Sequence, residues 1–143
     1  MAGLPGVGGT LVLDAEGLSK LAARDRRAYR RFEIAREHCA AIVTAASTLA
    51  EVLHGGPKDA AVHHWLKVIT VVSIDTEHGR AAGELLGKTG LSGNRCALDA
   101  LLAVVALAQA RPVVLLTSDP RDLGKLTEEP GRRKAERVAV VAI

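Results

Sequence analysis

The chain has very few aromatic residues, which make up 2% of its 143 positions and comprise one Trp, one Tyr and one Phe. This scarcity argues against a base-stacking platform of the kind that many single-strand nucleic-acid-binding proteins use. The hydrophobic core has to be built from Ala, Val, Leu and Ile instead. Such a composition is typical of helices that pack on a parallel sheet.

Cysteine and long apolar runs are also scarce. Cys39 and Cys96 are the two cysteines, and neither belongs to a CxxC motif or to a metal-binding spacing, which favours reduced thiols. No stretch reaches the roughly 18 uninterrupted apolar residues of a membrane span. The N-terminus lacks the basic region of a secretory signal. These absences predict a cytoplasmic protein without a membrane partner.

The composition is 48% hydrophobic and 24% charged, which predicts one folded domain over residues 1–143 with a glycine-rich, flexible lead-in at 1–10. The formal net charge is +3, and it is unevenly distributed. Six arginines lie close together: Arg24, Arg26, Arg27, Arg30, Arg31 and Arg36. A basic cluster suits an anionic partner, although a solvated helix face has the same composition.

Apolar segments alternate with helical patterns along the chain. Strands are predicted at 11–13, 40–44, 68–72, 113–117 and 138–142. Helices are predicted at 18–35, 47–53, 59–67, 75–86, 96–110 and 121–126. This order favours an α/β fold with a parallel sheet covered on both faces. Right-handed crossovers place the helix starts at the carboxyl edge of the sheet, where open α/β folds bind ligands.

Acidic residues recur at that predicted edge. Asp14 directly follows the first strand, and Asp119 directly follows the fourth. Glu51 lies in the first turns of the helix after the second strand, Asp99 opens the long helix before the fourth strand, and Asp122 comes one turn after Asp119. Clustered carboxylates repel one another unless a cation lies among them, and Mg²⁺ or Mn²⁺ prefers such hard oxygen ligands. A site of this kind suits metal-assisted cleavage of a phosphodiester bond.

Each acid also has a purely structural interpretation. Thr48 and Glu51 have the spacing of a capping box, and Asp119 before Pro120 is a typical helix N-cap. Asp14 and Asp99 are also placed to cap helices or to meet the positive end of a helix dipole. Capping does not, however, predict that four acids converge on one edge of a sheet.

Four segments, in order, resemble the PIN-domain family, and in particular the VapC-type toxin ribonucleases of type II toxin–antitoxin systems. They are Leu-Val-Leu-Asp-Ala at 11–15, Ser-Thr-Leu-Ala-Glu-Val-Leu at 47–53, Asp-Ala-Leu-Leu-Ala at 99–103 and Leu-Leu-Thr-Ser-Asp-Pro-Arg-Asp-Leu at 115–123. The resemblance implies a three-layer α/β/α PIN-like fold with a five-stranded parallel sheet. It also implies an endoribonuclease that acts on RNA, forms a homodimer and is neutralised by a cognate antitoxin.

The same resemblance assigns roles to individual residues. It makes Asp14, Glu51, Asp99 and Asp119 catalytic and ligands of Mg²⁺ or Mn²⁺, with Asp122 as an accessory ligand. Thr117 and Ser118 match positions that help to place the substrate or the metal ligands. The arginine-rich segment suggests Arg24, Arg27 and Arg31 for contacts with RNA or the antitoxin.

One residue departs from the family pattern, because Glu16 stands where a small polar residue is usual. The alternative function is therefore a catalytically inactive PIN fold that binds RNA or a protein. A phospho-receiver domain fits less well, because no lysine follows the fifth strand. A haloacid-dehalogenase-like phosphatase would need an aspartate at position 16.

Overall fold

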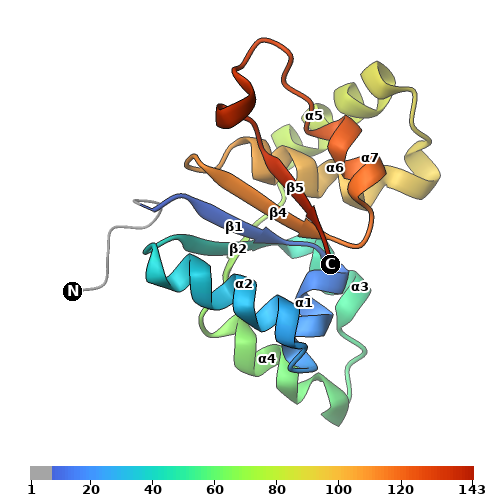
Figure 1. The fold of residues 1–143 in the computed structure, drawn as a ribbon. Coiled ribbons are helices and arrows are strands. Elements are labelled where there is room, and N and C mark those ends of the chain that lie inside the picture. Colours follow the sequence, from blue (N-terminus) through green and yellow to red (C-terminus); the bar gives the residue numbers. More distant parts are fainter. Residues whose placement is uncertain (1–7) are drawn as a thin grey trace.

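The computed structural model describes residues 8–143, and a five-stranded parallel sheet forms its centre (Figure 1). The strand order is β3-β2-β1-β4-β5, and every neighbouring pair is parallel. The strands are β1 (Thr10–Leu13), β2 (Ala41–Ala45), β3 (Thr70–Val72), β4 (Val113–Thr117) and β5 (Ala139–Ala142). Residues 1–7 of the predicted lead-in lie outside the described residues. Thr10, its last residue, already belongs to β1 and pairs with Ala41 and Val113.

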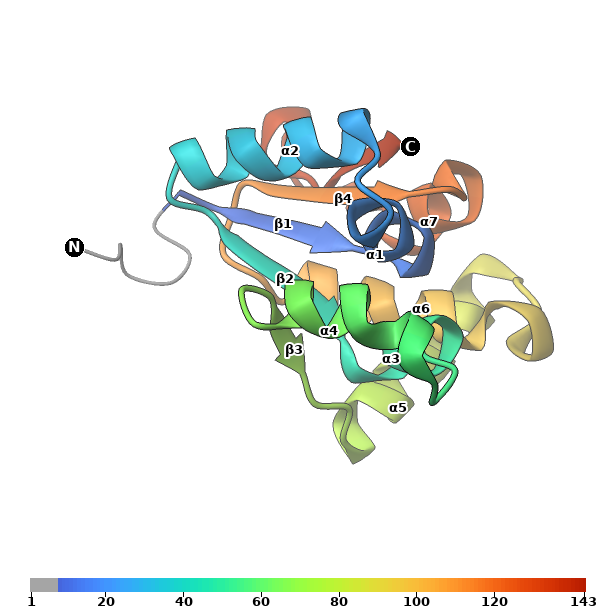
Figure 2. The same cartoon turned by 90° about the horizontal axis from the view of Figure 1, so that it is seen from below.

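Helices cover both faces of the sheet, so the predicted three-layer α/β/α fold is confirmed (Figures 1 and 2). One side carries α1 (Ala15–Ala22), α2 (Arg26–Glu37) and α4 (Ala60–Leu66). The other side carries α5 (Thr76–Thr89), α6 (Gly93–Leu107) and α7 (Pro120–Leu126). The short α3 (Ala46–Val52) follows β2 directly, and two single 3₁₀ turns complete the elements at Pro57–Asp59 and Lys134–Glu136.

The central strand shows why the strands are apolar without alternation. Val12 of β1 packs into the hydrophobic cluster on the α5–α7 side, whereas Leu11 and Leu13 pack into the cluster under α1, α2 and α4. A strand that is buried on both faces needs an apolar side chain at every position. Small residues on α6, among them Ala103 and Ala106, are fully buried and let this helix lie close to the sheet.

Element boundaries differ from the sequence prediction at three helices. The helical pattern predicted at 18–35 is two helices, because Arg24 adopts a left-handed conformation with φ 61° and Asp25 caps α2 by accepting hydrogen bonds from the N–H groups of Arg27 and Ala28. Both helices bury the same apolar side, which hides the break in the sequence pattern. Helix α5 continues past the predicted end to Gly90, whose φ of 71° terminates it. Helix α6 begins at Gly93 and ends at Leu107.

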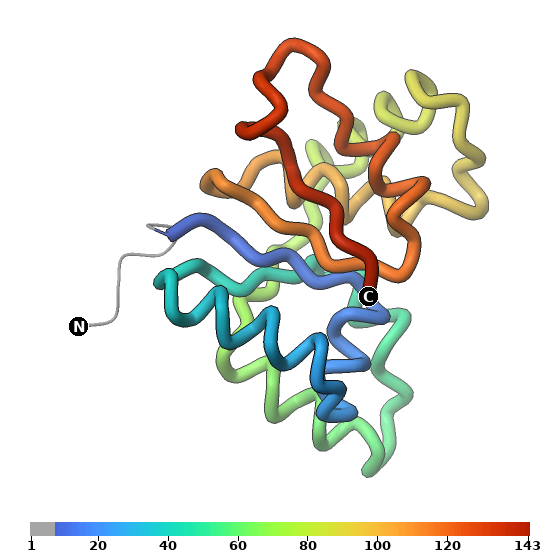
Figure 3. The backbone as a smooth tube through the Cα atoms, viewed as in Figure 1, coloured from blue at the N-terminus to red at the C-terminus, as the bar shows by residue number. Residues whose placement is uncertain are grey.

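The topology brings β1 and β4 together at a switch in strand order. The chain passes from β1 to β2 and β3 on one side and returns to β4 on the other side of β1. Figure 3 shows the carboxyl ends of these strands close to the C-terminus of the chain. Such a switch point is where open α/β sheets bind ligands. Within residues 8–143, no single helix is long and apolar enough to cross a membrane.

Candidate metal centre

Three carboxylates from two helices form a compact cluster. Asp99 lies in the second turn of α6, and Asp119 and Asp122 lie at the start of α7. Each offers an oxygen atom, and these atoms all lie within 4.8 Å of one another. All three side chains are half-buried. Oxygen atoms so close together are arranged as ligands for one hard cation.

Asp119 is held in place by its own turn. Its Oδ1 accepts a hydrogen bond from the Asp122 N–H at 3.2 Å, and Pro120 occupies the first helical position, so the predicted N-cap is confirmed. The Asp119 N–H donates to Oγ1 of Thr117 at 2.9 Å. Thr117 is completely buried, so its hydroxyl holds the loop that carries Asp119 and does not face solvent. The cap uses one carboxylate oxygen of Asp119 and leaves the other for a ligand.

Asp14 is the most enclosed of the five predicted site acids, with 7% of its surface exposed. Its Oδ1 accepts a hydrogen bond from the Gly17 N–H at 2.7 Å, and its Oδ2 accepts one from the Ser118 N–H at 3.1 Å. The Asp14 N–H in turn donates to the Leu116 carbonyl at 3.1 Å. Asp14 thus caps α1 and also joins the ends of β1 and β4. Two backbone donors fix the orientation of its carboxylate.

Glu51 is an exposed residue at the rim of this edge. The predicted capping box with Thr48 is wrong, because α3 begins at Ala46, its N-cap is Ala45, and Thr48 is buried within the helix. The Glu51 carboxylate is therefore not used to cap α3. Partial desolvation and the charge of Asp14 raise the pKa of Glu51 above its ordinary value.

The pKa of Asp99 shows most clearly how the neighbouring carboxylates affect this site. The structure corrects its predicted position at the helix start, because α6 begins at Gly93, more than one turn earlier. Burial is the largest cause that raises the pKa of Asp99, which reaches about 6. Four further carboxylates add to the rise: Asp119, Glu51, Asp14 and Asp122. The four other predicted acids therefore all lie close enough to act on Asp99, although only Asp119 and Asp122 share the compact cluster with it.

The Gly17 N–H bond to Asp14 is the helix cap that the position of Asp14 predicts. Two other contributors to the site have no signal in the sequence. The Ser118 N–H is a backbone donor, which any residue but proline supplies. Cys96, one turn before Asp99 on α6, is buried, and its thiol donates a long hydrogen bond of 3.7 Å to Oδ2 of Asp122. Only the tertiary structure reveals these contacts.

We call the carboxyl edge of the sheet with Asp14, Glu51, Asp99, Asp119 and Asp122 the acidic edge. The other predicted site residues are placed as follows. Ser118 is exposed, and only its backbone N–H is engaged with the acids. Arg24 lies in the turn between α1 and α2, whereas Arg27 and Arg31 are exposed on α2. Glu16, the departure from the family pattern, is exposed in the first turn of α1 and is not among the main causes of the raised pKa of Asp99.

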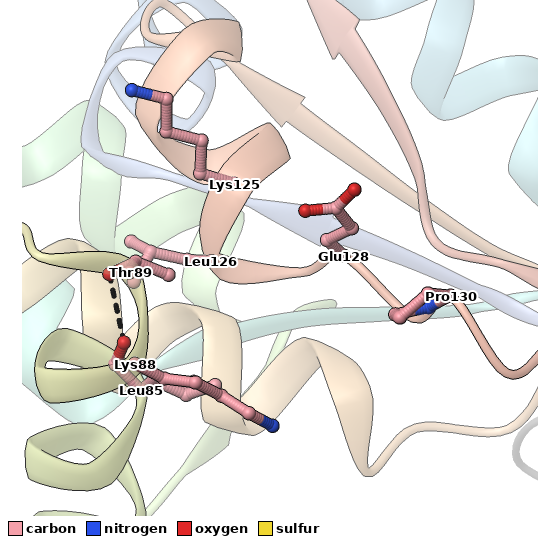
Figure 4. A pocket seen from close by; sticks show the side chains of 7 residues that line it. All are labelled: Leu85, Lys88, Thr89, Lys125, Leu126, Glu128 and Pro130. Carbon is pink, nitrogen blue, oxygen red and sulfur yellow. Dashed lines mark hydrogen bonds between the residues drawn. The ribbon is translucent and has the colours of Figure 1, made fainter.

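A separate hollow lies between α5 and the end of α7 (Figure 4). Its volume is about 410 Å³, and its charged residues are Lys88, Lys125 and Glu128. None of the five acids lines it. The acidic edge and this hollow are thus distinct features of the molecule.

Comparison with known proteins gives a family and a fold. The family model described as PIN domain matches residues 11–128. The structure of VapBC2 from Rickettsia felis bound to a DNA fragment from their promoter has a TM-score of 0.67 and 17% identity, with 94% of this chain and 98% of that chain covered. VapBC-1 from nontypeable Haemophilus influenzae has a TM-score of 0.57 and 16% identity, with 93% and 97% covered. No curated protein has a matching sequence.

Proposed function

The chain belongs to the PIN domain family, and from this we propose that it is a metal-dependent endoribonuclease of the VapC toxin type. The observation that supports the proposal is the compact cluster of Asp99, Asp119 and Asp122 beside the switch point, with Asp14 and Glu51 near enough to raise the pKa of Asp99. Their substrate would be a phosphodiester bond of RNA. The alternative is a PIN fold that binds RNA or a protein without cleaving anything.

The acidic edge fits a divalent cation of the Mg²⁺ or Mn²⁺ kind. Asp99, Asp119 and Asp122 would hold it, with Asp14 and Glu51 beside them. The raised pKa of Asp99 supports this fit. It shows that the ionised carboxylates repel one another, and a bound cation would remove that repulsion. When bound, such a cation lowers the pKa of a water molecule and polarises a phosphate oxygen.

The protein's own contribution is to orient the carboxylates in advance. The N–H groups of Gly17 and Ser118 hold Asp14, and the Thr117 hydroxyl and the turn into α7 hold Asp119. Groups that are already oriented need no rearrangement during the reaction. Glu51 is suited to accept a proton from water at its carboxylate, because it is exposed and its pKa is raised above its ordinary value, which makes it a stronger base.

RNA cleavage with Mg²⁺ or Mn²⁺ tests the proposal. Asp14→Asn and Asp99→Asn should each lower the cleavage rate by about 100-fold or more, because removing one preorganised charge typically costs that much. Glu77→Gln is the matched control, since Glu77 is an exposed acid on α5 that belongs neither to the carboxylate cluster nor to the main causes of the raised pKa of Asp99.

Two results would contradict the assignment. Equal cleavage by the wild type and both asparagine variants would exclude the acidic edge as the catalytic site. Absence of cleavage by the wild type, with circular dichroism and metal binding intact, would favour the alternative of an inactive binding module.

Partners follow from the same proposal. The two similar structures described above are of VapBC proteins, which supports a cognate antitoxin as a partner of this chain. A homodimer and a cytoplasmic location belong to the same proposal. Light scattering on the purified chain, alone and after co-expression with a neighbouring small open reading frame, measures both kinds of assembly.

A further inference from the structure

An arginine-lined groove lies between α2 and the carboxyl ends of β4 and β5. Its volume is about 440 Å³. Four arginines of α2 line it, Arg26, Arg27, Arg30 and Arg31, over an apolar floor that includes Leu116 and Ala142. No acidic side chain lines the groove. We call this feature the arginine groove.

Most of these guanidinium groups are free to bind a ligand. Arg30 makes long ion pairs with Glu33 at 3.6 Å and Glu37 at 3.8 Å. Within residues 8–143, Arg26, Arg27 and Arg31 make no ion pair and no side-chain hydrogen bond. Arg27 and Arg31 are four residues apart, so they lie on the same side of α2 with a rise of about 6 Å between them. The groove therefore offers several separate positive charges in a row.

The arginine groove adjoins the acidic edge. Leu116 in its floor accepts the hydrogen bond from the Asp14 N–H, and its carbonyl also faces Gly17 of α1. Ile143 at the other wall donates its N–H to the Thr117 carbonyl, two residues before Asp119. Figure 1 shows the C-terminus beside α1 at this end of the sheet. The groove and the carboxylates thus adjoin each other at the ends of β1, β4 and β5.

We propose that the arginine groove binds the phosphate backbone of the RNA strand next to the scissile phosphate. This inference rests on the proposed ribonuclease function. Carboxylates repel phosphates, so a strand that reaches the acidic edge has to be held by cations beside it. The arginine fork matches phosphate oxygens in pairs. An acidic protein segment would meet the same charges, but the position of the groove next to the proposed cleavage site, with Leu116 in contact with both, favours the RNA strand that is being cleaved.

The composition of the groove further predicts that it does not read the sequence of the RNA. No aromatic residue lines it, so no stacking platform for bases is present there. Contacts to phosphate fix the position of a strand but carry no sequence information. The arginine groove therefore contributes affinity that depends strongly on salt and is the same for different sequences.

Binding of single-stranded RNA tests the inference. Fluorescence anisotropy is measured with two fluorescein-labelled 12-mers, oligo(U) and a mixed sequence, on Asp99→Asn protein in EDTA so that no cleavage occurs. Adding Arg27→Ala and Arg31→Ala should reduce the slope of log affinity against log salt by about 1.4 for both RNAs, because each lost single-strand phosphate contact accounts for about 0.7. Arg80→Ala with Arg133→Ala is the charge-matched control, since both are exposed and lie outside the groove.

The kinetic readout separates the groove from the catalytic site. In protein with an intact acidic edge, the Arg27→Ala and Arg31→Ala pair should raise KM for both RNAs severalfold and leave kcat unchanged. The glutamine pair, Arg27→Gln with Arg31→Gln, repeats the measurement with side chains of greater length should the alanine pair fold poorly. Circular dichroism of each variant checks the fold.

The outcomes distinguish this inference from the function on which it rests. Arginine-dependent RNA binding by a chain that cleaves no RNA would leave the groove standing and overturn the ribonuclease. Cleavage with a KM and salt slope that the arginine pair does not change would overturn the groove and leave the ribonuclease. The inference would also be overturned if the Arg27→Ala and Arg31→Ala pair lost binding to a fluorescein-labelled oligo-glutamate peptide but bound RNA as well as the protein with both arginines. The groove would then be a site for an acidic protein segment.

Discussion

The carboxyl group of Asp99 gives the acidic edge a measurable dependence on pH. Its pKa is raised from 3.8 to about 6 in the folded chain, first by burial and then by four neighbouring carboxylates. Between these two pH values the folded state binds a proton that the unfolded state has lost. The free energy of unfolding of the metal-free protein therefore falls as the pH rises from about 4 to about 6 and stays lower above that range.

Asp99→Asn should remove this loss of stability. Two pKa units correspond to at most about 3 kcal/mol, and because the side chain is only half-buried we expect about 1 to 2 kcal/mol. In EDTA at pH 7.5, the variant should be more stable than the wild type in urea unfolding, and at pH 4.5 the difference should fall to about a third of that size, because the unfolded state has lost most of its proton there while the folded state still holds it. If the variant is less stable than the wild type at pH 7.5, the ionised Asp99 carboxylate does not destabilise the folded state.

Added Mg²⁺ or Mn²⁺ should have the opposite effect on the wild type. A ligand that binds only the folded state at 100 times its dissociation constant stabilises that state by about 2.7 kcal/mol. Thermal unfolding of the wild type should therefore shift upward with metal, and Asp99→Asn should shift much less because one carboxylate of the cluster is missing. Equal shifts in both proteins would place the bound cation elsewhere.

Helix α1 meets the end of β4 at Gly17, and this contact positions Asp14. A Cβ atom at Gly17 would lie 3.2 Å from the Leu116 carbonyl and 3.4 Å from Oδ1 of Asp14. The first distance is tighter than an ordinary contact, so the helix or the strand would have to shift. The same carbonyl accepts the Asp14 N–H, so a shift there would move the carboxylate.

Gly17→Ala should therefore lower metal-dependent cleavage while Gly79→Ala should not. Replacing glycine within an exposed helix by alanine normally stabilises a protein by about 1 kcal/mol. Gly79 in α5 has open space around its Cα, so the full gain is expected there. At Gly17 the contact with β4 should cancel the gain. Urea unfolding and initial cleavage rates measure both variants, and a Gly17→Ala protein with unchanged activity would show that Asp14 tolerates the shift.

Arg111 connects parts of the molecule that are distant in the chain. Its guanidinium donates to both carboxylate oxygens of Glu129, at 2.6 and 2.9 Å, to the Leu107 carbonyl at 3.0 Å and to the Glu136 carbonyl at 3.1 Å. The end of α6, the start of β4 and the segment before β5 are thereby held together. Both charged side chains are largely buried.

Arg111→Ala should destabilise the fold without altering the acidic edge. Loss of hydrogen bonds to a charged partner costs about 2 kcal/mol, and Glu129 would be left with only Arg132. Because Arg111 precedes β4, it lies at the end of that strand opposite Asp119. We expect a lower urea midpoint and an unchanged kcat at 25 °C. A lower kcat in fully folded Arg111→Ala protein would mean that the Arg111 contacts also position the carboxylates of the acidic edge.

Much of the fold follows from local patterns. Continuous apolar strands separated by helices predicted a parallel sheet covered on both faces, and the positions of Asp14 and Asp119 directly after strands predicted their shared edge. These features depend on side-chain chemistry and on short periodicities, which a sequence records directly. The sequence pattern does not predict the break at Arg24 and Asp25, because the apolar residues of both helices pack into the same hydrophobic cluster.

The order of the strands and the contacts across them belong to the tertiary structure alone. Ser118 donates to Asp14 across 104 residues of chain, and α6 brings Asp99 beside Asp119 and Asp122. The arginine groove likewise needs α2 to lie against the ends of β4 and β5. Backbone donors carry no signature in the sequence, and distances between remote segments are set by packing of the whole core. The sequence therefore determined which acids are available, whereas the strand order decided which of them face one another.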